Sequence, residues 1–161
     1  MVERPHRRRG LRSAAFDAEG VATRDSDLVR DGVLTRYVLG SYSARRLGLA
    51  TTANAGGIHN LDVSSNATDQ AELVRGMARG LLVTDLMGQG VNTLTGDYSR
   101  GAAGFWVENG EIAYPVDEIT IAGNLRSMFQ AIEAIGADVD RRSHIAVGAL
   151  LVGRMTVAGE A

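Results

Sequence analysis

The chain has 161 residues, a formal net charge of −2 and 45% hydrophobic residues, which suits one domain with an apolar core. It has no cysteine, which excludes disulfides, thiolate metal sites and a cysteine nucleophile. No apolar run reaches the roughly 20 residues of a membrane span, so we expect a cytoplasmic protein that neither enters a membrane nor binds nucleic acid.

The chain starts with a basic cluster, "HRRRGLR" at residues 6–12. Such clusters contact nucleic acid in some proteins, but no aromatic residues are interleaved with these arginines. We therefore expect residues 1–9 to be a basic, disordered start and residues 10–161 to form the domain.

The first predicted elements are two strands joined by a tight turn. Asp31-Gly32 lies between apolar runs, and an Asp-Gly pair favours a two-residue hairpin because both central positions need positive φ. Ser41 is expected to cap a short helix that Gly48 ends. The glycine-rich stretch "NAGGIHN", residues 54–60, follows as a loop.

The middle of the chain predicts a helix, a strand and a second hairpin. Thr68 is expected to cap the helix, and residues 81–86, "LLVTDL", form a short apolar strand. Asn109-Gly110 then joins "GFWV" to "EIAYPV" through another two-residue turn. Pro115 confines the second of these strands to a sheet edge or a strand end.

The last third predicts a helix followed by one or two strands. The helix is expected to start at an Asn124 cap and to end at Gly136. Its apolar stripe consists of Leu125, Met128, Phe129, Ile132 and Ile135. Because hairpins outnumber helices, we expect an α+β fold with a mainly antiparallel β-sheet and two or three helices.

The least ordinary stretch is "MGQGVNTLTGDYSRGAAGFWVENGEI", residues 87–112. It matches no phosphate-binding glycine motif, and the chain has no lysine. Ser99 lies in no G-x-S-x-G motif, so a serine nucleophile is not supported. Gly96, Gly101 and Gly104 instead suggest close backbone approach. Two interpretations remain open, namely strand addition by an extended peptide and a bulge at a sheet corner.

Metal binding has little support from the three histidines. His6, His59 and His144 lie far apart, and none shares a metal-binding spacing with another. A metal site would require them to converge in space.

The run "GLLVTDLMGQGVNTLTGDYSRGAAGFWVENGEIAYPVDEITIAGNL" resembles the C-terminal part of the TldD/PmbA family, known as modulators of DNA gyrase. The stretches "RGLRSAAFDAEGVATRDSDLVRDGVLTRYVLGSYSARRLGL" and "NAGGIHN" resemble the part that precedes it. The resemblance covers residues 10–159. Within it, the stretch "DYSRGAAGFWVENGEI" is similar to the PmbA-like (TldE-like) branch of the family. Family members are much longer, so we expect this chain to correspond to their final portion only.

The resemblance implies the C-terminal domain of a subunit that works with a TldD-like zinc subunit in cytoplasmic proteolysis of small, unfolded peptides. It implies no catalytic residue and no metal ligand in this chain, with the zinc held by the partner. The TldD-like branch supplies a cysteine ligand in this region, which this chain does not have.

Two groups of residues are candidates for contact with the partner or the peptide. The first group is Gly96, Asp97, Tyr98, Ser99, Arg100 and Gly101, in which Arg100 is expected to hold a carboxylate or a carbonyl. The second group is Gly56, Gly57 and His59. Two alternatives stay open: a metallopeptidase in its own right, with His59 and His144 on one ion, and a self-associating β-rich module that forms homo-oligomers.

Overall fold

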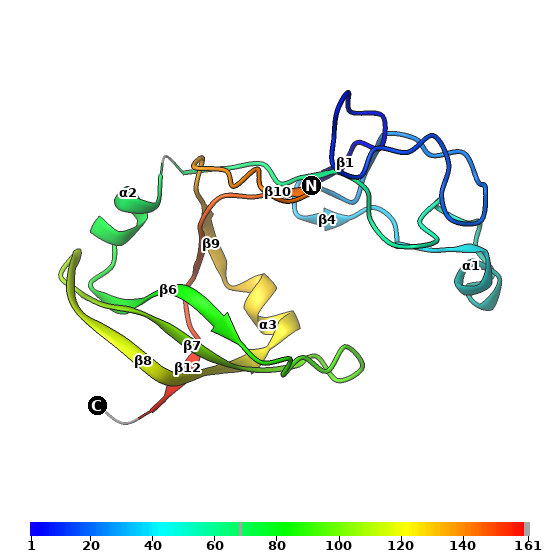
Figure 1. Ribbon diagram of the computed structural model, residues 1–161. Helices are drawn as coiled ribbons and strands as arrows, with labels where there is room; N and C mark the ends of the chain where they lie inside the picture. Colours follow the sequence, from blue (N-terminus) through cyan, green and yellow to red (C-terminus); the bar gives the residue numbers. More distant parts are fainter. Residues whose placement is uncertain (68, 160–161) are drawn as a thin grey trace. The chain divides into compact units, whose positions relative to one another are not determined.

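The computed structural model describes residues 1–67 and 69–159, and it has an α+β fold with mainly antiparallel sheets (Figure 1). This confirms the predicted fold class. The chain divides into two compact units: unit 1 is Met1–Ser64 with Val139–Gly148, and unit 2 is Ser65–Asp138 with Ala149–Ala161. Within the described part of the chain, no helix is long and apolar enough to cross a membrane.

Unit 1 contains a four-stranded sheet built from very short strands. The strand order is β10-β5-β1-β2, in which β1 runs antiparallel to both neighbours and β10 runs parallel to β5. The strands are β1 (Val2–Glu3), β2 (Ser26–Asp27), β5 (Leu61–Asp62) and β10 (Ile145–Ala146). With two residues in each strand, the ladder supplies few hydrogen bonds, and side chains must satisfy many of the backbone groups in the loops.

The structure places β1 inside the first nine residues of the chain. The expected division of the chain into residues 1–9 and residues 10–161 stays a prediction. Limited proteolysis tests it, because cleavage confined to residues 1–9 that leaves the rest intact is the result that this division requires.

The first predicted hairpin is confirmed. It consists of β3 (Val29–Arg30) and β4 (Val33–Leu34), which pair antiparallel. Between them Asp31 has φ 51° and Gly32 has φ 77°, as a two-residue turn of this kind requires.

The predicted helix near residue 41 is α1 (Ser41–Leu47), but Ser41 is not its cap. Gly40 occupies the N-cap position without a side-chain hydrogen bond, and the Ser41 N–H instead donates to Glu19 Oε2 at 2.8 Å. The carboxylate of Glu19 therefore satisfies one of the first N–H groups of the helix, which have no partner within the helix itself. Gly48 ends the helix with φ 66°, as predicted.

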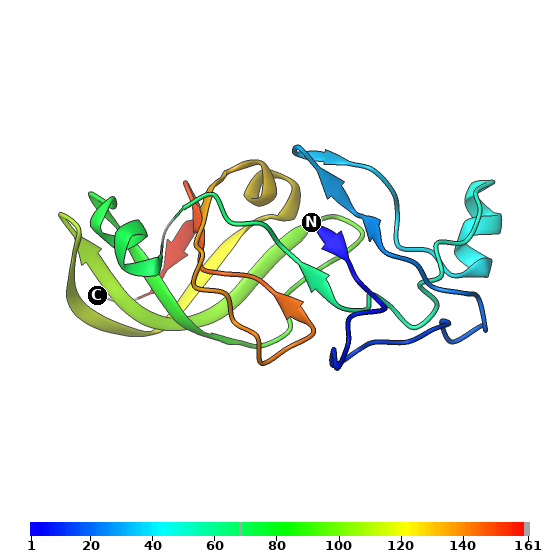
Figure 2. The ribbon, with the colours of Figure 1, turned by 90° about the horizontal axis from the view of Figure 1, so that it is seen from above.

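Unit 2 is built on a four-stranded antiparallel sheet of order β12-β8-β7-β6. Its strands are β6 (Arg79–Met87), β7 (Asp97–Glu108), β8 (Glu111–Asn124) and β12 (Thr156–Ala158). Figures 1 and 2 show β7 and β8 as a long, curved hairpin. The strand predicted at residues 81–86 is the middle of β6, which is an edge strand paired only with β7.

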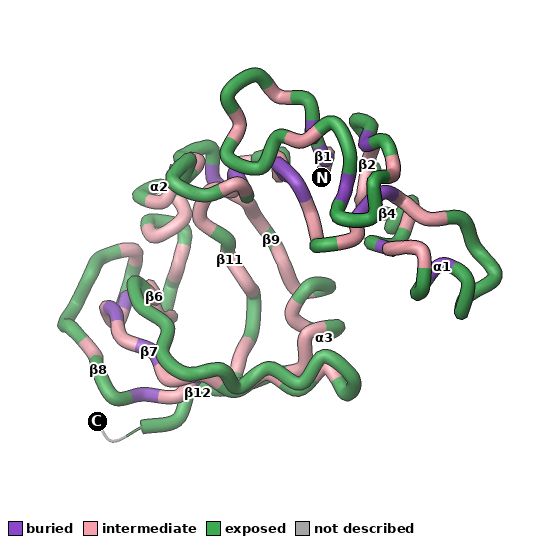
Figure 3. Tube along the Cα trace, turned by 45° about the vertical axis from the view of Figure 1, so that its right-hand side comes forward, coloured by how far each residue is buried: buried purple, intermediate pink, exposed green. Residues whose placement is uncertain are grey.

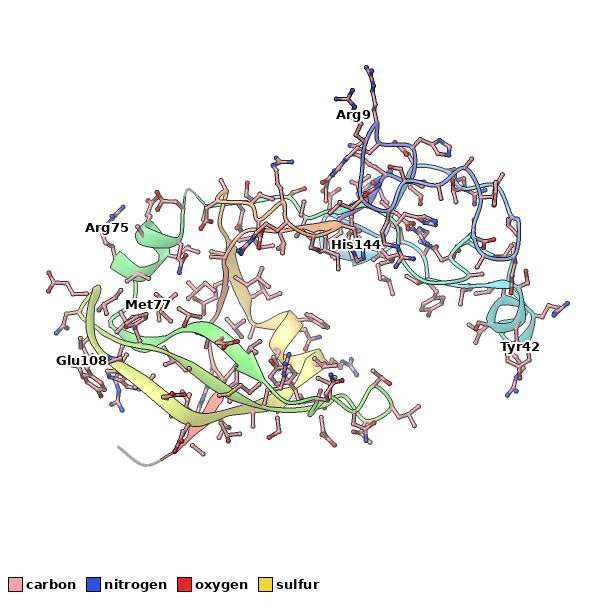
Figure 4. The ribbon with its side chains drawn as sticks, in the orientation of Figure 1. Arg9, Tyr42, Arg75, Met77, Glu108 and His144 are labelled. Atoms are coloured by element: carbon pink, nitrogen blue, oxygen red, sulfur yellow. The ribbon has the colours of Figure 1, made fainter. Side chains whose placement is uncertain are left out.

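The second predicted hairpin is also confirmed, with Asn109 at φ 52° and Gly110 at φ 81°. The N–H groups of this turn donate to the chain that leads from α2 into β6, where Met77 is labelled in Figure 4: Asn109 N donates to Ala78 O at 2.7 Å, and Gly110 N donates to Met77 O at 2.8 Å. A Cβ atom on Gly110 would lie 2.6 Å from Arg75 O, so the close approach requires glycine.

Pro115 lies inside β8, opposite Phe105 of β7. On its other side β8 pairs with β12 only at residues 120–122. Among the described residues no second strand pairs beside the proline, and this local edge is the environment that its missing N–H requires.

Helix α2 (Gln70–Arg75) has Asp69 as its N-cap, whose Oδ1 accepts a hydrogen bond from Glu72 N at 2.8 Å. This is the side-chain cap that the first turn of a helix favours. Thr68, the cap predicted from sequence, lies outside the described residues.

The helix predicted from Asn124 to Gly136 is only half correct. Asn124 caps α3 (Leu125–Gln130), and its Oδ1 accepts from Arg126 N at 3.1 Å, but the helix stops at Gln130. The next residues form β9 (Ile132–Ile135), which pairs antiparallel with β11 (Leu150–Val152). The β-branched isoleucines suit a strand, and long-range pairing outweighs the helical spacing. The C-terminal region accordingly holds three strands, β10, β11 and β12, instead of one or two.

The buried residues occur as short stretches separated by exposed ones (Figure 3). In unit 2, Ala102, Ile119 and Ile121 form a cluster that Leu81 and Val83 cover in part. In unit 1, several of the most deeply buried side chains are polar: Glu3, Asp17, Asn54, His59 and Asn60. Buried polar groups require hydrogen-bond partners, and this network is therefore a candidate functional site.

Candidate functional site

The first candidate group lies at the start of β7. Gly96 has φ 81° and precedes the strand, and residues 97–101 are its first five residues. Asp97 and Ser99 are exposed, while Tyr98 and Arg100 are partly buried. The structure therefore presents these residues together on one stretch of strand, with alternate side chains open to solvent.

The main chain of this stretch is already paired on both sides. Asp97 and Tyr98 pair with β8. On the other side the loop that joins β6 to β7 returns alongside: Ser99 N donates to Gly90 O at 2.7 Å, and Asn92 N donates to Asp97 O at 2.8 Å. A peptide can reach the exposed side chains here, but it cannot add as a strand without displacing this loop. The role of the group in binding stays a prediction.

Arg100 holds carbonyl groups of its own chain. Its Nη2 lies 3.2 Å from Leu86 O and its Nε lies 3.4 Å from Met87 O, at the end of β6. The guanidinium thus holds the last two residues of the edge strand β6 against β7. The prediction that it also holds a carboxylate or carbonyl of a partner remains to be tested.

The glycines of this region let the chain approach itself. A Cβ atom on Gly104 would lie 2.0 Å from Leu82 O, and one on Gly90 would lie 1.7 Å from Ser99 O. Both distances are far shorter than a carbon–oxygen contact allows, so these positions require glycine. Part of the glycine pattern in the sequence is thereby explained by packing within unit 2.

The unit 2 sheet has two edge strands, the three-residue β12 and the longer β6. Strand β6 has nine residues, and no strand of the described part of the chain pairs with its outer side. The loop beyond it is held by Asn92, whose Oδ1 accepts from Leu94 N at 3.0 Å, and Leu94 is 96% exposed. A long, open strand edge such as that of β6 is a surface to which another chain can add.

The second candidate group lies in the loop before β5 in unit 1. Gly56 has φ 92° and Gly57 has φ 101°, a backbone conformation that favours glycine. His59 is only 6% exposed, so its side chain lies beneath the loop rather than on its surface.

Glu3 is the centre of the polar network beneath that loop. Its Oε1 accepts from His59 N at 2.6 Å and from Asn54 Nδ2 at 2.8 Å, and lies 3.0 Å from His59 Nδ1. Oε2 forms an ion pair with Arg36. Burial raises the pKa of Glu3, but the hydrogen bonds from His59, the charge of Arg36 and the Asn54 amide together hold that pKa below its ordinary value.

No motif or spacing in the sequence marks Glu3 or Arg36 as site residues. Both carry charges of a kind found on most protein surfaces, and Glu3 lies within residues 1–9, which were expected to be disordered. The small polar stretch at residues 54–60 was the only usable signal, because it pointed to His59 and to the loop that covers it.

The three histidines do not converge on a metal site. His6 Nε2 lies 3.0 Å from Thr23 Oγ1, His59 contacts Glu3, and His144 is partly buried, with its carbonyl accepting from Leu61 N. Residues 1–67 and 69–159 contain no group of three or more His, Cys, Asp or Glu side chains arranged to hold a metal ion. The zinc that the family resemblance implies is expected in the partner subunit, and the residues that the structure describes offer no set of ligands for it.

Taken together, a long antiparallel hairpin sheet and a loop-rich unit with a buried polar network define an α+β domain. The family model for the PmbA/TldA metallopeptidase C-terminal domain matches residues 1–159. The chain belongs to this family.

Relatives and solved structures agree with this assignment. The chain is 54% identical over 158 residues to metalloprotease PmbA of Escherichia coli O157:H7, covering 98% of this chain and 35% of the relative. It is 28% identical over 134 residues to a zinc metalloprotease TldD homologue of Saccharolobus solfataricus, covering 76% of this chain and 30% of that protein. The chain thus spans about a third of the length of the curated relatives it matches.

Among solved structures, a protein named as a modulator of DNA gyrase from Thermotoga maritima matches with a TM-score of 0.85 and 36% identity, over 98% of this chain and 38% of that one. TldE of Thermococcus kodakarensis matches with a TM-score of 0.79 over 98% of this chain and 39% of that chain; at 23% identity it shows the shared fold alone.

Proposed function

We propose that this chain is a non-catalytic domain of a cytoplasmic PmbA/TldE-type subunit, which pairs with a TldD-like zinc subunit and contacts the extended, unfolded peptides that the pair degrades. The likeness to PmbA over 98% of the chain supports the subunit type. The single structural observation that carries the peptide role is the open edge of β6, since main-chain hydrogen bonds at such an edge bind extended peptides without regard to sequence.

The first candidate group extends this binding surface. Asp97 and Ser99 project from β7 beyond the end of β6, beside the loop that joins the two strands, and Arg100 holds the end of β6 in place. Side chains here add specificity to a contact whose affinity comes from the main chain.

The pairing is tested by mixing this chain with a purified TldD-type subunit and measuring the mass in solution by light scattering. A species heavier than either chain alone is expected, and two unchanged species would refute the pairing. A concentration series of this chain by itself separates self-association from pairing, because a homo-oligomer grows without the second protein.

The peptide contact is tested by fluorescence anisotropy with a labelled, unstructured peptide and with the same peptide N-methylated at alternate residues. Methylation removes main-chain donors, so binding is expected to weaken about tenfold or more if two or more such bonds form. The double variant Asp97→Ala/Ser99→Ala should weaken binding less, and Asp117→Ala, which removes an exposed acid from β8, is the matched control. Equal binding of both peptides would refute strand addition.

A further inference from the structure

An open hollow in unit 2 lies between helix α2 and one face of the sheet. It has a volume of about 640 Å³. Its lining comes from the segment at residues 69–75, from Leu82 of β6, from residues 110–112 at the start of β8, and from Asp138. All of these residues belong to unit 2, so the hollow is a feature of one compact unit.

The floor of the hollow is apolar. Leu82 pairs with Phe105, and Ile112 pairs with Val107. Because side chains alternate along β7 and cross-strand partners lie on the same side of a sheet, Leu82 and Ile112 share one face. Val74 of α2 completes the apolar lining. Ile112 is 53% exposed, so a side chain that enters the hollow meets aliphatic groups that solvent now covers.

The rim of the hollow carries more negative than positive charge. Asp69, Glu111 and Asp138 are acidic, and Arg75 is the only basic residue among the described lining residues. None of the three acids forms an ion pair with a described residue. Glu111 also lies opposite Glu108 in the β7–β8 register, and like charges in that arrangement destabilise a sheet. The rim therefore lacks a counter-charge, which a cationic ligand supplies.

The hollow extends to the open edge of the sheet. Leu82 belongs to β6, and no strand of the described part of the chain pairs with the outer side of β6. A peptide that adds to such an edge points every second side chain to the same face of the sheet. A peptide added beside Leu82 therefore points side chains towards the face on which the hollow lies.

We propose that this hollow binds a lysine or arginine side chain of a peptide added to β6. The aliphatic stem packs on Leu82, Ile112 and Val74. The cationic head lies at the rim, beside Glu111 and Asp138. Lysine and arginine combine a long apolar stem with a charged head, which matches an apolar floor with an acidic rim. The inference rests on the proposed strand addition at β6 and names the side chain that this site prefers.

The experiment compares two labelled peptides, Ser-Thr-Val-Arg-Val-Thr-Ser and the same peptide with citrulline in place of arginine, by fluorescence anisotropy with the intact chain. Citrulline keeps the length and shape of arginine but carries no charge. The arginine peptide is expected to bind about fivefold more tightly. Raising the salt concentration from about 0.05 M to about 0.5 M should remove most of that difference, because exposed charges are screened.

A pair of matched variants locates the contact. Glu111→Gln/Asp138→Asn removes two charges from the rim and should reduce the preference for arginine to less than about twofold. Asp117→Asn/Glu118→Gln removes the same two kinds of charge from an exposed part of β8 outside the hollow, and it should leave the preference unchanged.

Three results overturn the inference, and they separate it from the proposed function. If the arginine and citrulline peptides bind equally, the hollow does not select a cation, and strand addition at β6 survives. If the preference for arginine persists in Glu111→Gln/Asp138→Asn, the charge is recognised elsewhere on the chain. If neither peptide binds at millimolar concentration, both the side-chain site and the peptide contact are wrong.

Discussion

Units 1 and 2 solve the same problem, the satisfaction of buried polar groups, in opposite ways. In unit 2 the buried residues are apolar, among them Ala102, Val107 and Ile119, and two strands of 12 and 14 residues pair their main-chain groups along most of their length. In unit 1 the strands of the main sheet have two residues each, and charged or amide side chains do the pairing instead.

The difference has a consequence for stability. A β-ladder loses one hydrogen bond at a time, whereas a buried charge that loses its partner costs several kcal/mol at once. Every described group whose pKa shift is resolved, including Glu3, Asp17 and Asp140, lies in unit 1. The stability of unit 1 should therefore depend mainly on the charges of its side chains, and the stability of unit 2 mainly on the volumes of its side chains. Trp106, the only tryptophan, lies in β7 and reports on unit 2 alone.

Removal of the central carboxylate should have the largest effect. Glu3→Ala leaves Arg36, which is 14% exposed, without its partner, and we expect a loss of about 3–5 kcal/mol in unfolding free energy. The measurement is urea denaturation followed by the amide NMR signals of unit 1. Asp25→Ala removes half of an exposed ion pair with Arg4 and should cost less than about 1 kcal/mol. Similar losses for the two variants would contradict the network's role.

Acidification should unfold unit 1 before unit 2. The folded pKa values of Glu3 and Glu19 lie below 4.5 and that of Asp17 lies below 3.8, so the unfolded chain binds protons more readily. The stabilisation is complete above about pH 5 and is lost as the pH falls through these folded values. Asp140, with its pKa lowered to about 2 by Arg142, titrates last. Amide NMR and Trp106 fluorescence between pH 6 and 2 should give different midpoints, and one shared midpoint would refute the separation.

Overpacking the β6–β7 contact should disturb unit 2. Gly104→Ala places a methyl group 2.0 Å from Leu82 O, and we expect a loss of about 1–3 kcal/mol. Thermal unfolding followed by Trp106 fluorescence measures it. Gly76→Ala is the matched control, because this residue has φ −77° and a Cβ atom there meets nothing closer than 3.4 Å. An equal loss in both variants would show that the close approach is unimportant.

Loss of a helix cap should have the smallest effect. Asp69→Ala removes the acceptor for Glu72 N at the start of α2 and should cost about 1 kcal/mol. Asp69→Asn keeps an acceptor and should recover most of that loss. The comparison is made by hydrogen exchange of the α2 amides, and exchange unchanged in Asp69→Ala would mean that the cap does not hold the helix.

The sequence predicted the parts of the fold that depend on neighbouring residues. The turns at Asp31-Gly32 and Asn109-Gly110, the end of α1 at Gly48 and the Asn124 cap all follow from local backbone chemistry. The family likeness also follows from a contiguous stretch of sequence. These features need no knowledge of the rest of the chain.

The parts that depend on distant partners were missed. The stretch after Gln130 reads as a helix until its pairing with β11 is known. Glu3 contacts Asn54 and His59, more than 50 positions away, and one sequence contains nothing that links them. The candidate group at residues 96–101 was found through its glycines, while the acceptors around His59 became visible only through the fold.

The hydrogen bonds at the tip of the β7–β8 hairpin also bear on how the protein ages. Deamidation at an Asn-Gly pair requires the glycine nitrogen to attack the asparagine side chain. In this turn the Gly110 N–H donates to Met77 O, and Arg75 O closes the space around the glycine. Chemical damage at Asn109 therefore requires the tip to detach first, and its rate over weeks of storage measures how often that detachment occurs.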